Sequence, residues 1–104
     1  MEGIEARHEV NFGIVGGGRT TGTGMEINWQ NGPLGRGDDK KEPNGAQVED
    51  VIGAAIGRLD AFQYSKFNND YNGRALAHLH AAIKILGDRT TDRERRGVEG
   101  TNQA

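Results

Sequence analysis

The sequence contains no cysteine and few hydrophobic residues: only 34% of its 104 residues are hydrophobic, and six are aromatic. The lack of cysteine excludes disulfide bonds, thiolate nucleophiles and cysteine metal sites. No apolar run approaches the roughly 20 residues that cross a bilayer, and the N-terminal residues lack the layout of a signal peptide. We therefore expect a soluble, cytosolic protein with a modest hydrophobic core. Self-association would compensate for the small amount of apolar surface that one chain buries.

Charge is balanced along the chain, with 13 basic and 15 acidic residues and a net charge of −2. This balance argues against a protein that coats long nucleic acid by bulk attraction, so any nucleotide ligand should be small. With three histidines and no cysteine, we expect no metal site. No nucleophile with an adjacent base is recognisable, and we expect no enzymatic activity.

The N-terminal part has strand-like patterning. Residues 8–15 and 25–29 alternate between apolar and polar side chains and predict two short strands. The glycine-rich residues 16–24 between them look too flexible to form either a strand or a helix. Residues 1–24 are therefore expected to be a flexible leader or a β-hairpin with a long turn, and residues 25–43 a short strand followed by a charged linker.

A first helix is predicted from Asn44, a good N-cap with Gln47 in the reciprocal capping position. The apolar residues that follow recur at helical spacing and form one stripe: Val48, Val51, Ile52, Ala55, Ile56, Leu59 and Phe62. Gly53 and Gly57 lie one turn apart and lower helix propensity, which suggests that another backbone packs closely against them.

A second helix is predicted to start at Asn69 or Asp70. Its seam matches the stripe of the first helix: Asn72, Leu76, Leu79, Ile83 and Leu86, with Ala75 and Ala82 beside it. Gly87 either ends this helix or lies within it, since Thr91 and Glu94 form a further capping box. Residues 44–97 thus predict an antiparallel helical hairpin, and residues 98–104 a fraying tail.

Two helices alone cannot enclose a core, because each covers only one side of the other, so they must pack on the strands or on other copies. The predicted fold class is α+β: short N-terminal antiparallel strands followed by an antiparallel two-helix hairpin that oligomerises.

Four of the six aromatic residues fall between positions 62 and 71: Phe62, Tyr64, Phe67 and Tyr71. Three arginines near the C-terminus, Arg89, Arg93 and Arg96, share one face of a helix. In an antiparallel hairpin the two groups lie at opposite ends, so only a neighbouring subunit can bring them together. The alternative is that the rings cap the hairpin and the arginines are solvated charge.

Several motifs resemble a known family: Asn44-Gly45, residues 48–52, Arg58-Leu59, Phe62-Gln63, Arg89-Thr90 with Arg93, and the ending Gly97-Val98-Glu99-Gly100-Thr101. Together they look like the helical hairpin of phage immune-signal sponges, small proteins that counter the bacterial CBASS and Thoeris systems by sequestering nucleotide messengers. The resemblance covers roughly residues 25–101 and is strongest from residue 44 onward.

The resemblance implies an oligomer in the cytoplasm of the bacterial host, dimers assembling into a hexamer, with messengers held between subunits, no cofactor and no chemistry. In the Thoeris-directed members it implies that Phe62 stacks on the adenine of a cyclic ADP-ribose isomer and that Asn72 hydrogen-bonds a polar edge. Arg89 and Arg93 would clamp the diphosphate. Flanking candidates are Lys66, Phe67, Thr90 and Arg96. Some members also bind cyclic oligonucleotides at a second site.

A competing hypothesis is a small structural or protein-interaction module of a phage with no nucleotide ligand. In that case the aromatic residues would only staple a helix interface. A hydrolytic enzyme is the third interpretation, and it would require degradation of the messenger.

Overall fold

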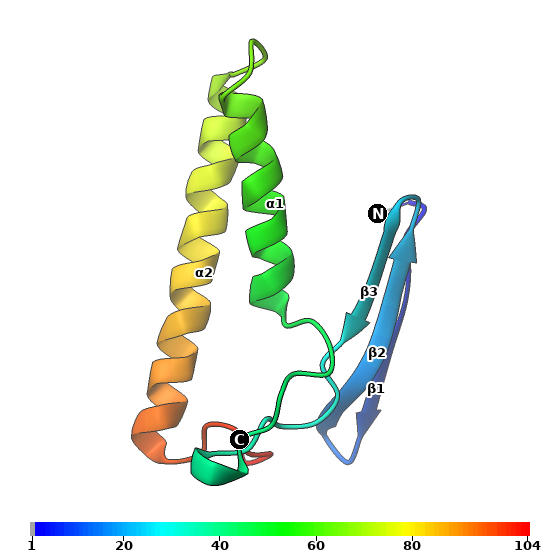
Figure 1. Ribbon diagram of the computed structural model, residues 1–104, viewed down its shortest axis with the longest axis vertical. Coiled ribbons are helices and arrows are strands. Elements are labelled where there is room, and N and C mark those ends of the chain that lie inside the picture. The colour runs from blue at the N-terminus through cyan, green and yellow to red at the C-terminus, as the bar shows by residue number, and fades with distance from the viewer. Residues whose placement is uncertain (1) are drawn as a thin grey trace. The chain divides into compact units, whose positions relative to one another are not determined.

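The computed structural model describes residues 2–104. The chain divides into two units: one comprises the residues up to Gln47 together with Arg96–Ala104, and the other comprises Val48–Arg95. The first contains strands β1 (Glu5–Asn11), β2 (Ile14–Gly22) and β3 (Met25–Trp29) and a short 3-10 helix, η1 (Gly37–Asp39). The second contains helices α1 (Val48–Gln63) and α2 (Asp70–Arg96), of which α2 runs on by one residue into the first unit. The α+β fold class is confirmed, with three antiparallel strands ahead of two helices (Figure 1).

The glycine-rich stretch is the central strand of the sheet, and the prediction of a loose loop over residues 16–24 was wrong. β2 pairs with both β1 and β3, with Gly18 opposite His8 on one side and Trp29 on the other. A β-carbon at Gly18 would overlap the backbone carbonyl of Arg7. The glycine therefore serves close strand approach rather than flexibility.

The single strand predicted over residues 8–15 is broken by a turn. Phe12 has a φ of 53° and Gly13 a φ of 75°, the left-handed pair that a tight β-hairpin turn requires. Val10 and Ile14 consequently fall on different strands. The two-residue turn also leaves the Phe12 side chain fully exposed.

The linker before α1 is closed by side-chain amides. Asn44 accepts a hydrogen bond from the Asn31 amide at 2.8 Å and donates its Nδ2 to the Asn31 carbonyl at 3.0 Å. Ala46 extends the edge of the sheet through a parallel bridge with Trp29. The prediction that Asn44 is the N-cap of α1 was therefore wrong. Its side chain is hydrogen-bonded to Asn31, and the helix begins at Val48.

The C-terminal residues dock on this linker rather than fraying. The Gly35 amide donates to the Gly100 carbonyl at 3.0 Å, and the Arg36 guanidinium donates to the Gly97 carbonyl at 2.6 Å. Thr101 adds a local bond from its hydroxyl to the Val98 carbonyl. The ending Gly97-Val98-Glu99-Gly100-Thr101 is thus fastened to the segment around η1 within the first unit.

The helices run antiparallel, side by side (Figure 1), and their half-buried faces agree with the predicted seam of α2 and with part of the predicted stripe of α1. These half-buried apolar residues are Val51, Ile52, Ile56 and Leu59 on α1 and Leu76, Leu79, Ala82, Ile83 and Leu86 on α2. Ala55, Val48 and Phe62, which the predicted stripe included, are exposed. Among residues 2–104 no hydrophobic side chain is fully buried, so the hairpin has an interface but no core.

The glycines of the helices are not explained by contacts within the chain. α2 continues through Gly87 without a break and ends at Arg96, with Gly97 in the left-handed conformation that favours helix termination. Around Gly53 and Gly57 nothing lies within 4 Å of where a β-carbon would stand. The backbone that the sequence predicted against these two glycines is therefore not α2.

Candidate functional site

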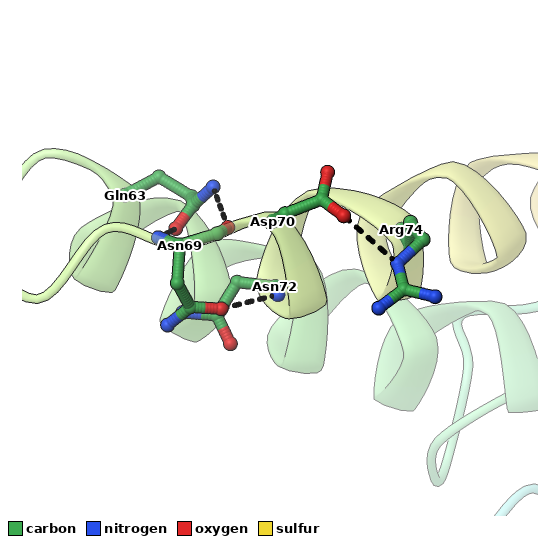
Figure 2. A network of polar contacts seen from close by, with 5 residues as sticks. All are labelled: Gln63, Asn69, Asp70, Asn72 and Arg74. Atoms are coloured by element: carbon green, nitrogen blue, oxygen red, sulfur yellow. Dashed lines mark hydrogen bonds and ion pairs between the residues drawn. The ribbon is translucent and has the colours of Figure 1, made fainter.

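The turn between the helices is held by one side-chain amide at the end of α1 (Figure 2). Gln63 donates its Nε2 to the Asn69 carbonyl at 3.0 Å and accepts the Asn69 amide on Oε1 at 3.1 Å. Both hydrogen bonds join the last residue of α1 to the residue just before α2. This clamp sets where the two helix ends lie with respect to each other.

Asn69 is also the N-cap of α2, one of the two caps that the sequence predicted. Its Oδ1 accepts the Asn72 backbone amide at 2.8 Å (Figure 2), which satisfies an amide that the first helical turn leaves unpaired. Asp70 pairs with Arg74 one turn later at 3.1 Å. Gln63, which follows Phe62, and Asn69, which caps the amide of Asn72, therefore belong to one hydrogen-bond network. This network holds the backbone beside Phe62 and Asn72 in place.

Asn72 is half-buried on the first turn of α2. Its backbone amide is capped, whereas its side-chain amide has no hydrogen-bond partner within residues 2–104. A half-buried carboxamide with an unused donor and acceptor is able to recognise a polar ligand edge.

Phe62 lines a shallow surface pocket of about 200 Å³ together with Arg58, Ala61, Ser65 and Phe67. The Ser65 hydroxyl donates to the Phe62 carbonyl at 2.6 Å and accepts the Phe67 amide at 3.0 Å. This serine therefore holds the backbones on which both rings stand. Phe62 is 41% exposed and Phe67 63% exposed, which leaves ring surface available to a planar ligand.

Cations accompany three of the four clustered aromatic rings. Arg58 Cζ lies 5.4 Å from the Phe62 ring centroid, and Lys66 Nζ lies 5.3 Å from that of Phe67. Arg74 lies 4.9 Å from the Tyr71 ring, while Tyr64 is 96% exposed and has no such cation among residues 2–104. Exposed rings with cations are suited to a ligand that is both planar and anionic.

The other end of the hairpin carries the arginines. Arg89 Nη2 lies 3.5 Å from Oε1 of Glu49 in the first turn of α1, and that oxygen is buried without a hydrogen bond. Thr90 donates its hydroxyl to the Leu86 carbonyl at 3.3 Å, and Arg93 is half-buried. Arg96 donates to the Ala104 carbonyl at 2.8 Å.

Asn72 and Arg89 are 17 positions apart on one continuous helix, which amounts to about 26 Å along α2. The structure thus places Phe62, Lys66, Phe67 and Asn72 around the interhelical turn, and Arg89, Thr90 and Arg93 at the far end of the same hairpin. One chain does not bring the two groups together.

Sequence reasoning missed three residues of these surfaces. Gln63 has no periodic signal, and the Glu49 contact with Arg89 depends on the pairing of the helices. Arg58 could have been found, because it stands one helical turn before Phe62, a spacing that places two side chains on one face.

No helix between residues 2 and 104 is long and apolar enough to span a membrane. No group of three or more histidine, aspartate or glutamate residues in that range is arranged to hold a metal ion.

Comparison with known proteins identifies one informative relative. No protein-family model matches the chain. A Bacillus phage SBSphiJ7 protein named Thoeris anti-defense 1 is 42% identical over 77 residues, which make up 74% of this chain. The matched region is 51% of that protein, so the chain spans about half the length of the relative it matches. By this identity, the chain belongs to the phage anti-Thoeris family.

Proposed function

We propose that this protein is a phage anti-defence protein that binds and sequesters nucleotide messengers of bacterial immunity, chiefly a cyclic ADP-ribose isomer, without degrading them. The observation that carries the proposal is the exposed Phe62 ring, which stands in a pocket beside a guanidinium in a chain of the anti-Thoeris family. Sequestration would take place in the cytoplasm of the infected cell, where the messengers are made.

In the proposed complex, adenine stacks on Phe62, with Phe67 and Lys66 at the pocket rim. The unpaired side-chain amide of Asn72 hydrogen-bonds a polar edge of the ligand. Arg89 and Arg93 clamp the diphosphate, because guanidinium forks match phosphate oxygens. Thr90 and Arg96 flank this clamp.

The arginines come from a neighbouring copy of the chain. Two arguments support this step: the separation of about 26 Å within one hairpin, and the lack of a fully buried hydrophobic side chain in residues 2–104. A hairpin without a core gains stability when its exposed apolar surface is covered by other copies. We propose dimers that assemble into a hexamer, as the family resemblance implies.

Mixing two inactive variants tests the shared site directly. Phe62→Ala removes the stacking ring and Arg89→Ala removes the clamp, so each variant alone should bind no messenger. In randomly mixed dimers about half of the molecules are heterodimers, and each contains one intact site, so about a quarter of all sites recover. Zero recovery after verified subunit mixing would place both groups in one chain.

A second experiment separates sequestration from the other two hypotheses. Purified protein is incubated with a panel of cyclic ADP-ribose isomers and cyclic oligonucleotides, and the nucleotide is recovered after heat denaturation. Sequestration predicts depletion of a messenger followed by its intact release. Degraded messenger would identify an enzyme, and absence of uptake across the panel would favour a structural module.

A further inference from the structure

We infer that Arg58 is a ligand-binding residue of the Phe62 pocket and takes up a phosphate of the bound nucleotide. This inference rests on the proposed function and adds a guanidinium that neither the family motif of two arginines nor the sequence analysis assigned. Arg58 stands one helical turn before Phe62 on α1, lines the same pocket, and has its guanidinium carbon 5.4 Å from the ring centroid.

Unlike Arg74, Lys84 and Arg89, Arg58 has no carboxylate partner within residues 2–104. Arg74 pairs with Asp70 at 3.1 Å and Lys84 with Asp88 at 2.9 Å, each one helical turn away. The residues one turn from Arg58 are Ala54, Ala55, Ala61 and Phe62, none of which is acidic. Its charge is therefore not neutralised by its own helix face.

The size of the pocket argues for a ligand that extends beyond it. At about 200 Å³ it is smaller than the roughly 300 to 1,000 Å³ of ordinary small-molecule pockets. It suits a base stacked on Phe62, while the sugar and phosphate must lie at the rim. Arg58 lines this pocket, and its five N–H donors suit a phosphate group.

This arrangement gives each subunit both parts of a nucleotide-binding half-site. The ring and one guanidinium come from α1 of one chain, and Arg89 and Arg93 of the neighbour complete the diphosphate clamp. Arg58 would then hold the phosphate on the adenosine side of the ligand. The ligand class is a nucleotide that carries a diphosphate on its sugar and has one face of its base free to stack.

The test is calorimetric titration of the full chain with a cyclic ADP-ribose isomer. Arg58→Gln should raise Kd by about tenfold or more, since it removes a charge-assisted contact, and should reduce the dependence of Kd on salt. Arg58→Lys keeps the charge but loses the fork, so it should give a smaller increase. The matched control is Arg7→Gln on the exposed strand β1, which removes another arginine that has no carboxylate partner in the described part of the chain.

The outcomes separate this inference from the proposal beneath it. If Phe62→Ala abolishes binding while Arg58→Gln leaves both Kd and its salt dependence unchanged, Arg58 is not a binding residue and the proposed function stands. If the wild-type chain binds no isomer, the proposed function itself fails. Far-ultraviolet circular dichroism monitors helicity. If Arg58→Gln loses helicity, the Kd of Arg58→Lys is used instead to decide whether Arg58 binds the ligand.

Discussion

Replacing Gly100 with alanine tests whether the C-terminal motif has the structural role assigned to it. Gly100 has a φ of 75°, and its carbonyl accepts the Gly35 amide at 3.0 Å. A β-carbon at Gly100 would overlap the carbonyl oxygen of Gly35, with the Arg36 side chain also within 3.2 Å. The docked segment has no room for even the smallest side chain.

The expected cost has two physical contributions. An L-residue in the left-handed region costs about 1 to 2 kcal/mol, and loss of the hydrogen bond from Gly35 costs about 0.5 to 1.5 kcal/mol. We therefore expect Gly100→Ala to lower the free energy of unfolding by about 2 to 3 kcal/mol. For a chain of this size that corresponds to a decrease in Tm of roughly 10 °C or more.

The assay is thermal and urea unfolding followed by circular dichroism, with Gly87→Ala as the matched control. Gly87 lies inside α2 and is exposed, and nothing lies within 4 Å of where its β-carbon would stand. The same chemical change should therefore raise stability there by about 1 kcal/mol, because alanine favours helix more than glycine.

Opposite signs for these two substitutions are the result that supports the docked motif. Should Gly100→Ala unfold at the same temperature as the wild type, with unchanged hydrogen exchange at the Gly35 amide, the contact between the C-terminal segment and the linker would be refuted.

Three further changes follow from single contacts. Gln63→Ala removes both hydrogen bonds to Asn69. Hydrogen exchange of the Asn69 amide should therefore accelerate about tenfold or more, and messenger binding should weaken. Unchanged exchange at this amide would contradict the clamp between Gln63 and Asn69. Phe12→Asn places an asparagine in the left-handed turn position that Phe12 occupies. Because asparagine tolerates this conformation better, thermal unfolding should show the chain stabilised by about 1 kcal/mol. A loss of stability would be the contrary result. Gly53→Ala with Gly57→Ala should reduce the assembly mass measured by light scattering if another copy packs on this face of α1, whereas a more stable assembly of unchanged mass would show that the face is free.

Local sequence patterns determined the helical hairpin and much of the site's position. The spacing of Leu76, Leu79, Ile83 and Leu86 predicted the seam of α2, and Asn69 was one of the two caps predicted for its start, because helix periodicity and N-capping depend on residues within one or two turns. Phe62 and Asn72 were expected at the same end of the hairpin for this reason, and the structure places them on either side of the clamp between Gln63 and Asn69.

Contacts between distant segments were decided only by the tertiary structure. Glycine composition indicated a loose loop, yet Gly18 pairs with both neighbouring strands, and the Arg7 carbonyl of β1 leaves no room for a β-carbon there. Asn44 looked like a helix cap, but its side chain satisfies the backbone of Asn31, thirteen residues earlier. The C-terminal residues were predicted to fray, but the Gly100 carbonyl accepts a hydrogen bond from the Gly35 amide. The local sequence indicates which backbone groups need hydrogen-bond partners. Which distant residue supplies the partner depends on how the chain folds.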